Sequence, residues 1–350
     1  MTLAVSVVST ARTLARPVGN AHTTWSDRAS CIITLKSDTE RGQGEAAPLP
    51  DFSPDGLRIG EQALAALDLR EIPTRLAPNQ DLIGELRRAS VRIPPHLPAA
   101  RAALEAALLD LWSRAAAVPA WKLLLPVGAK PVARPVAALL SGDPEQARAQ
   151  AIAARERGIE TFKFKIGRPG ARQRELVAVQ GLRASLGAQA RLRLDANQAW
   201  HAAQAREYLP SFAASDLEFI EEPCPQHELT RLDGLGLPLA LDESLATGAR
   251  PRPGQRAVIL KPTLLGGVTA CVELAEAARA VGAEVILSHA FEGPLGLGLS
   301  AALALSIGSE RLAHGLDPEG AHLEQLSLPW YSEAAIRAWS EPGFGIPEQP

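Results

Sequence analysis

The chain has few cysteines, no excess of charge of either sign and no long apolar run. Three cysteines in 350 residues, none of them in a Cys-x-x-Cys pair, exclude a disulfide framework and a zinc knuckle, and a reducing cytoplasm is the expected location. The chain has 36 Lys and Arg against 39 Asp and Glu, so it has no excess of basic charge, and nucleic acid is not expected as a partner. No apolar run approaches the roughly 18 residues of a bilayer span, so no membrane partner is expected either.

What the sequence does contain is material for a large core. Hydrophobic residues make up 46% and charged residues 21% of the chain, which excludes a disordered protein. The length exceeds that of a single domain of about 150 residues. It fits one large α/β barrel, or a barrel with a smaller partner domain.

The first part of the chain predicts an α+β domain. Strands are expected at 3–11, 31–36 and 42–49, and a polar loop at 17–22 is long enough to act as a flap over a site. Helical stretches are expected at 58–91 and 98–117.

From about residue 130, short apolar segments alternate with helical ones. Strands are expected at 132–140, 161–167, 191–197, 217–223, 238–244, 257–263, 284–290 and 311–317. Eight strands alternating with helices predict an α/β fold, a modified TIM-like (β/α)₈ barrel, over 119–317. The preceding residues 1–118 would form an α+β capping domain, joined by the C-terminal segment 318–350. An open doubly wound sheet is the alternative, but the only glycine-dense stretch, 293–298, follows the seventh strand and not the first.

Two lysines interrupt the second expected barrel strand. Lys163 and Lys165 are two positions apart and share a face, while Phe162, Phe164 and Ile166 take the other face and can pack under helices. The lysines would therefore point into the barrel. An isolated pair of this kind would more simply belong to a solvated edge strand, because lysine is rarely buried.

Charged residues at the ends of the following strands favour the buried interpretation. Successive strands end in Asp195, Glu221-Glu222, Asp242 and Lys261, each about one βα unit after the previous one. The carboxyl ends of barrel strands form the face on which active sites are built. Any one of these carboxylates could merely cap the next helix, but the whole set in register is improbable by chance.

The carboxylates predict a metal, and the lysines predict proton transfer. Three carboxylates from adjacent strands repel each other unless a cation lies between them, and oxygen-only ligands favour Mg²⁺, with Mn²⁺ as a substitute. A divalent cation bound to a substrate carboxylate can stabilise the enediolate that forms when an α-proton is removed. The base must be a neutral amine, and Lys163 beside Lys165 would lower the pKa of such an amine. The predicted partner is a small-molecule carboxylate.

The pattern resembles the enolase superfamily, in its muconate-lactonizing-enzyme-like subgroup, which has a Lys-x-Lys on the second strand and a lysine on the sixth. The resemblance covers nearly the whole chain. Several stretches are similar to the o-succinylbenzoate synthases, the dehydratase family of menaquinone biosynthesis: GQGEAAPLPDFSPD (42–55), RLRLDANQAW (191–200), FIEEPC (219–224), LALDESL (239–245) and VILKPTLLGG (258–267).

The resemblance implies roles for individual positions. Asp195, Glu221 and Asp242 would bind the metal; the alternation along the strand does not separate Glu221 from Glu222, and the resemblance prefers the first. Lys165 would be the base, with Lys163 adjusting its pKa, and Lys261 would remain a cation on the opposite side of the substrate.

Further positions are implied around these. Asn197, Arg193 and Glu222 would support the site from behind the ligands, or serve only structural hydrogen bonding. Strand seven departs from the family, where relatives often carry a serine-rich run and this chain has LSHAFEGPLG. Ser288 is the expected contact for a substrate carboxylate there, whereas His289 is expected to be structural.

Other functions share part of this pattern. N-acylamino-acid racemases and dipeptide epimerases use the same two lysines, although dipeptide epimerases usually carry an acidic pair on strand eight and only Asp317 lies there. A Schiff-base aldolase using Lys261 would not need three carboxylates in register. A non-enzymatic scaffold would not be expected to retain every charged position.

Overall fold

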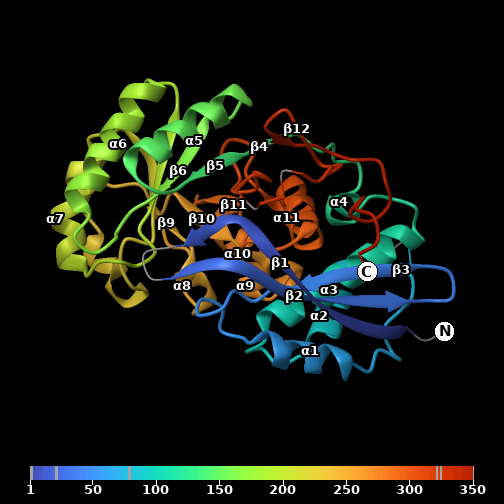
Figure 1. The fold of residues 1–350 in the computed structure, drawn as a ribbon. Helices are drawn as coiled ribbons and strands as arrows, with labels where there is room; N and C mark the ends of the chain where they lie inside the picture. Colours follow the sequence, from blue (N-terminus) through green and yellow to red (C-terminus); the bar gives the residue numbers. More distant parts are fainter. Residues whose placement is uncertain (1–2, 20–22, 78–79, 321, 324, 350) are drawn as a thin grey trace.

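The computed structural model describes residues 3–19, 23–77, 80–320, 322–323 and 325–349, and contains a curled parallel sheet beside an antiparallel sheet that has its own helices (Figure 1). The fold class expected from the sequence is confirmed. Among the described residues, none of the helices is both long and apolar enough to cross a membrane.

The N-terminal part is an antiparallel sheet covered by helices. Its strands are β1 (Ala4–Gly19), β2 (Thr24–Lys36) and β3 (Arg41–Ala46), paired in the order β1-β2-β3. Its helices are α1 (Leu57–Ala65), α2 (Leu82–Ser90), α3 (Pro98–Ala115) and α4 (Ala120–Leu124). The stretch 58–91, which was expected to be helical, thus contains two helices with an irregular segment between them. Pro73 lies in the irregular segment between them, where a helix would lose a hydrogen bond and clash with the ring.

The loop expected at 17–22 is wrong in its first three residues. Pro17–Gly19 belong to β1, and residues 20–22 lie outside the described residues. The pairing of Thr13 with Asp27 gives way to the pairing of Val18 with Trp25, so β1 bulges by several residues near its end.

Helix α3 packs directly across β3 because two glycines leave room for it. A Cβ atom at Gly42 would lie 2.3 Å from the carbonyl oxygen of Ala107, and one at Gly44 would lie 2.0 Å from that of Ala103. The glycines of the GQGEA stretch therefore allow the close approach of strand and helix.

The barrel is built from parallel strands in the order β11-β10-β9-β8-β7-β6-β5. These strands are β5 (Ala137–Leu140), β6 (Thr161–Lys165), β7 (Arg191–Asp195), β8 (Leu217–Glu221), β9 (Leu239–Leu241), β10 (Ala257–Leu260) and β11 (Glu284–Leu287). The helices between and after them are α5 (Pro144–Glu156), α6 (Arg172–Leu186), α7 (Ala202–Ala213), a 3₁₀ helix (Gln226–Leu232), α8 (Glu243–Ala246), α9 (Pro262–Leu265), α10 (Val268–Ala280) and α11 (Pro294–Ile307).

The prediction of a regular eighth strand at 311–317 is wrong. That segment joins the two edges of the sheet through single bridges, Val136 with His314 and Ser288 with Gly315. The His314 carbonyl accepts from the N–H of Ala137 at 2.8 Å, and the Gly315 N–H donates to Leu287 at 2.9 Å. The barrel is thus closed by an irregular segment.

The C-terminal residues pack against the N-terminal part. The Phe344 N–H donates to Asp110 of α3 at 3.0 Å, and the Gln349 N–H donates to Gln43 of β3 at 2.8 Å. A small sheet joins β4 (Arg134–Pro135), which precedes β5, to β12 (Tyr331–Ser332) and β13 (Ala335–Ile336) of the C-terminal segment. The division into a capping domain at 1–118 with 318–350 and a barrel at 119–317 stays a prediction.

Alternate residues of the barrel strands have different surroundings, as their sequence pattern indicated. Phe162, Phe164 and Ile166 lie in the main core under the helices. A separate apolar cluster inside the barrel contains Phe219, Ala240, Ala257, Ile259, Ile286 and Leu312. The interior is filled at this level, so a cavity can open only above it, toward the carboxyl ends of the strands.

Candidate active site

Charged residues lie level with one another at the carboxyl ends of neighbouring strands. Lys165 of β6 is paired in register with Asp195 of β7, which is paired with Glu221 of β8. Asp242 directly follows β9, and Lys261 directly follows β10. The parallel register therefore brings to one rim residues that are up to a hundred positions apart.

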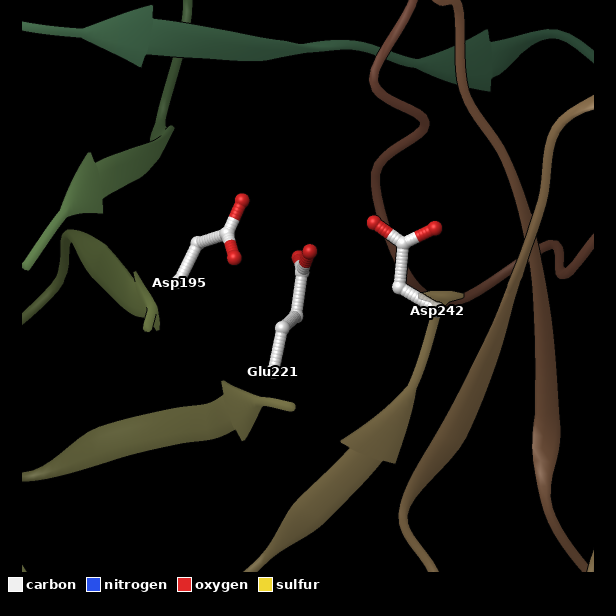
Figure 2. Close-up of side chains that lie close together, drawn as sticks. All are labelled: Asp195, Glu221 and Asp242. Atoms are coloured by element: carbon white, nitrogen blue, oxygen red, sulfur yellow. The ribbon is translucent and has the colours of Figure 1, made fainter. Parts of the chain in front are cut away.

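Three of these residues form a group able to hold a metal. Figure 2 shows the carboxylates of Asp195, Glu221 and Asp242 gathered above the ends of their strands. One oxygen from each lies within 4.8 Å of the others, and all three side chains are buried. Burial raises the pKa of Glu221 to about 7, and the two neighbouring carboxylates add to this effect while Lys163 opposes it. Crowded oxygen donors of this kind fit a hard divalent cation, which would relieve their repulsion.

Glu222 faces away from this group. Its φ of 37° takes the backbone out of the strand conformation, and its carboxylate accepts from the backbone N–H groups of Asp242 and Ser244 at 2.8 and 3.0 Å. The Ser244 hydroxyl and the Gln198 amide also donate to it, at 2.7 and 3.1 Å. Glu222 thus fixes the turn that carries Asp242, while Glu221 faces the site.

Lys163 lies beside the carboxylates. Its Nζ is 3.1 Å from Oδ2 of Asp195 and 3.0 Å from Oε2 of Glu221. Burial alone would lower the pKa of Lys163, but the carboxylates of Glu221 and Asp195 raise it above its ordinary value. Lys163 is therefore a permanent cation in this arrangement.

Lys165 and Lys261 differ in their electrostatic surroundings. Burial lowers the pKa of Lys165 to about 8, helped by the charge of Lys163 and opposed by Asp195. The ammonium of Lys261 forms an ion pair with Asp242 and lies 5.6 Å from the centre of the Phe52 ring. Burial tends to lower the pKa of Lys261, but the nearby carboxylates outweigh burial and raise it. A neutral amine is thus accessible at Lys165 near pH 8, whereas Lys261 stays an ammonium.

The supporting positions inferred from the sequence lie beside or below the ligands. The Asn197 backbone N–H donates to Asp195 at 3.1 Å, and its side-chain amide donates to Glu243 at 2.7 Å. Arg193 lies inside the barrel below Asp195, where its guanidinium donates to Glu218 at 2.6 Å and to the carbonyl of Ala313 at 2.8 Å. Arg193 therefore forms part of the cavity floor.

A cavity above these residues is bounded by apolar side chains from both parts of the molecule. Trp25 and Phe52 from the N-terminal part pack edge to face, with ring centroids 6.3 Å apart. Phe291 and Leu139 from the barrel side pack in the same apolar group and also line the cavity. No sequence pattern indicates this cover, because its members lie far apart in the chain and follow no common period.

The segment after β11 forms another wall. Ser288 and His289 both line the cavity, and the Ser288 hydroxyl lies 3.4 Å from the carbonyl of Gly315. Two residues that sequence reasoning missed support this segment from the N-terminal part. Arg28 donates to the carbonyl oxygens of Phe291 and Ala290 at 3.1 and 3.3 Å. Glu45 accepts from the N–H of Gly293 at 2.9 Å.

Asp317, the acidic residue of the eighth segment, is already engaged. Its two carboxylate oxygens accept from Arg157 at 3.2 and 2.9 Å, and the Tyr331 hydroxyl donates to one of them at 3.2 Å. Asp317 lines the cavity, but its charge is matched by a guanidinium.

Known proteins resemble the chain over most of its length. Residues 2–124 match the N-terminal domain of the mandelate racemase/muconate lactonizing enzyme family, and residues 146–347 match the enolase C-terminal domain-like family. The o-succinylbenzoate synthase of Klebsiella pneumoniae is 31% identical over 312 residues, covering 87% of both chains, and that of Aliivibrio salmonicida is 29% identical over 324 residues, covering 90% of both. Muconate lactonizing enzyme from Pseudomonas fluorescens has a TM-score of 0.83 at 24% identity, covering 99% of this chain and 96% of its own. The L-Ala-D/L-Glu epimerase of Bacillus subtilis has a TM-score of 0.80 at 23% identity, covering 99% and 98%.

Proposed function

Because the chain belongs to the mandelate racemase/muconate lactonizing enzyme family of the enolase superfamily, we propose that it removes a proton next to a substrate carboxylate and eliminates water, acting as an o-succinylbenzoate synthase in menaquinone biosynthesis. The observation that carries the proposal is the contrast between Lys165 and Lys261, a neutral amine and a fixed ammonium that line the same cavity. The curated relatives named above support the choice of substrate.

The proposed metal site is the group of three carboxylates. Asp195, Glu221 and Asp242 would hold Mg²⁺, with Mn²⁺ as a substitute. When bound, the ion supplies positive charge that stabilises the substrate carboxylate as its α-proton leaves. Glu222, through its hydrogen bonds to the turn after β9, keeps Asp242 in place for this role.

Lys165 would act first as a base and then as an acid. The C–H bond next to the carboxylate breaks as its proton moves to the neutral amine of Lys165. A carbon–carbon double bond then forms as the C–O bond to the hydroxyl breaks, and the leaving oxygen takes the proton back from Lys165 and departs as water. Lys261 would stabilise the developing negative charge without exchanging a proton.

The cavity lining suits a ring. Trp25, Phe52 and Phe291 present apolar surface opposite the charged rim, so a six-membered hydrocarbon ring could lie between them and the lysines. The same apolar cover would exclude water from the reacting atoms.

An N-acylamino-acid racemase activity is the second candidate. The two lysines from different strands are also the arrangement needed for proton transfer on two faces of one carbon. A dipeptide epimerase is less well supported, because the ion pair between Asp317 and Arg157 leaves no free carboxylate there for a substrate ammonium group.

The test is turnover by the purified protein. With Mg²⁺, we expect conversion of the hydroxycyclohexadiene carboxylate substrate to o-succinylbenzoate, followed by its ultraviolet absorbance, and no conversion after EDTA until Mg²⁺ or Mn²⁺ is returned. Full turnover by protein shown to be metal-free by elemental analysis would contradict the metal assignment. Racemisation of an N-acylamino acid without any dehydration would replace the proposal by the second candidate.

A further inference from the structure

We propose that the imidazole of His289 binds the carboxylate of the substrate's side arm, by donating a hydrogen bond from its Nε2–H into the cavity. The inference rests on the proposed function, since the product named o-succinylbenzoate carries one carboxylate on its ring and a second at the end of a succinyl arm. His289 would hold the second carboxylate and thereby determine which ring acids are bound.

The hydrogen bonding of the ring determines where its proton lies. Nδ1 of His289 accepts from the backbone N–H of Phe291 at 3.2 Å. A nitrogen that accepts carries no proton, so the neutral ring has its hydrogen on Nε2. Burial, together with the positive charges of Lys163 and Lys261, holds the pKa of His289 well below its usual value, which agrees with a neutral ring.

The position of Nε2 directs this donor into the cavity. A Cβ atom placed on Gly320 would lie 3.6 Å from Nε2 and 3.6 Å from Leu139, and all three residues line the cavity. Within the described ranges, the structure contains no hydrogen bond from Nε2 to another residue. Nε2 is also absent from the side-chain atoms that are both fully buried and unpaired, so this donor is open to a ligand atom or water in the cavity.

The ring is held firmly in this orientation. Phe291 adopts a left-handed backbone conformation, with φ at 61°, and its ring packs against His289 with centroids 5.1 Å apart. Two guanidinium groups donate to the carbonyl oxygen of Phe291, that of Arg28 at 3.1 Å and that of Arg12 at 2.9 Å. A strained turn fixed from outside is typical of a binding site.

The charges facing the ring favour an anionic partner. The groups that act on its titration are Lys163, Lys261, Arg12 and His322, and each disfavours the protonated ring. These positive groups add to the attraction of an anion to the ring, and a carboxylate accepts a hydrogen bond from neutral imidazole more strongly than a carbonyl does.

Two substitutions separate the proposed role from a structural one. The Oδ1 atom of Asn at this position can replace Nδ1 as the acceptor for Phe291, but His289→Asn loses the donor at Nε2. His289→Gln can place its amide nitrogen near Nε2, but it loses the acceptor. The probes are o-succinylbenzoate and o-butyrylbenzoate, which differ in having a carboxylate or a methyl group at the end of the arm, and their Kd values are measured by calorimetry with the Mg²⁺-loaded protein.

We expect the wild type to prefer o-succinylbenzoate over o-butyrylbenzoate. His289→Asn should weaken o-succinylbenzoate binding by roughly 10- to 100-fold, the effect of losing a hydrogen bond to a charged group, and leave the butyryl probe nearly unchanged. His289→Gln should retain most of the preference. Equal loss for both probes, or loss in the Gln variant alone together with a lower Tm, would show a structural role and overturn the inference. Turnover by the wild type is the separate control: if it is absent, the proposed function itself fails.

Discussion

Two lysines of the same chemical type differ in protonation because their neighbours differ. Burial lowers the pKa of the Lys165 amine to about 8, because Lys165 forms no ion pair among the described residues and Lys163 on the same strand adds to the effect. Lys261 is paired with Asp242 and its pKa is raised. The assignment of base and cation therefore depends on contacts that a substitution can remove.

Replacing each lysine should have a distinct effect. We expect Lys165→Ala to abolish the exchange of the substrate α-proton with deuterium from the solvent, because no other neutral amine is available. Lys261→Ala should retain some exchange but lower kcat on the order of 10³-fold with KM little changed, since it removes charge stabilisation. Lys261→Arg should restore only part of the rate, because a planar guanidinium differs in shape from an ammonium. Exchange retained in Lys165→Ala but lost in Lys261→Ala would invert the assignment.

The pH dependence should follow the amine of Lys165. Below its pKa of about 8 the side chain is protonated and cannot accept a proton, so kcat/KM should rise about tenfold per pH unit up to about pH 8 and then level off. The measurement is kcat/KM between pH 6 and 9.5 at constant ionic strength and saturating Mg²⁺. A profile that is flat or falls with pH between 6.5 and 8 would exclude Lys165 as the base.

The adjacent residues Glu221 and Glu222 offer a matched pair for the metal site. We expect Glu221→Gln to weaken Mg²⁺ binding, measured by calorimetry, at least tenfold more than Glu222→Gln does, because only Glu221 faces the other two carboxylates. Glu222→Gln should instead lower the thermal stability, since it disturbs the bonds to Asp242 and Ser244. The reverse order of metal affinities would shift the ligand assignment by one residue.

At the scale of secondary structure, the sequence indicated where the site residues lie but not how each strand ends. Lys165, Asp195 and Glu221 were identifiable because buried parallel strands carry few charges and these residues recur at each strand end. The alternation of residues did not separate Glu221 from Glu222, because the positive φ at Glu222 leaves no mark in it, and the choice of Glu221 rested on the family resemblance.

The closing segment of the barrel shows the same limit. Residues 311–317 contain the apolar residues expected of a strand, yet they form only single bridges, because side chains replace part of the backbone pairing. Nδ1 of His314 accepts from the N–H of Leu287 at 2.9 Å, and its Nε2 lies 3.0 Å from the carbonyl of Ser309. A buried histidine used in this way has no periodic signature.

This histidine should make the protein sensitive to acid. Burial lowers the pKa of His314 to about 3 in the folded protein, against about 6.5 in an unfolded chain. A lowered pKa means that the full contribution to stability is present above pH 6.5 and is lost as the pH falls from there toward 3. At pH 5 the loss should be about 2 kcal/mol.

The measurement is urea unfolding at pH 7 and pH 5. His314→Gln should be less stable at pH 7, but its stability should fall by about 2 kcal/mol less than that of the wild type between the two pH values. If the stability of His314→Gln falls between pH 7 and pH 5 by as much as that of the wild type, His314 is not the titrating group.

At the scale of the whole molecule, the site is divided between two parts that must stay docked. The barrel supplies the charged rim, and the N-terminal part supplies Trp25 and Phe52. Two carboxylates fasten the parts by accepting from the first turns of barrel helices. Glu105 of α3 binds the N–H and hydroxyl of Thr269 in α10, at 2.9 and 2.6 Å, and Glu45 of β3 binds the N–H groups before and within the first turn of α11.

These two carboxylates make the same kind of contact, but only Glu45 binds the segment after β11, which forms a wall of the cavity, and this difference allows a controlled prediction. Glu45→Ala and Glu105→Ala should each lower the free energy of unfolding by about 1–3 kcal/mol, because each leaves buried N–H groups without a partner. Only Glu45→Ala should also weaken the binding of o-succinylbenzoate to the Mg²⁺-loaded protein. Glu45 accepts from Gly293, which follows the turn that carries His289 and Phe291, whereas Glu105 accepts from Thr269 in the first turn of α10, which does not line the cavity. Urea unfolding and calorimetry on the same samples measure both quantities. Equal loss of affinity in the two variants would mean that the N-terminal part acts on the site through overall docking. An affinity unchanged in both would mean that the wall formed by the segment after β11 keeps its shape without Glu45.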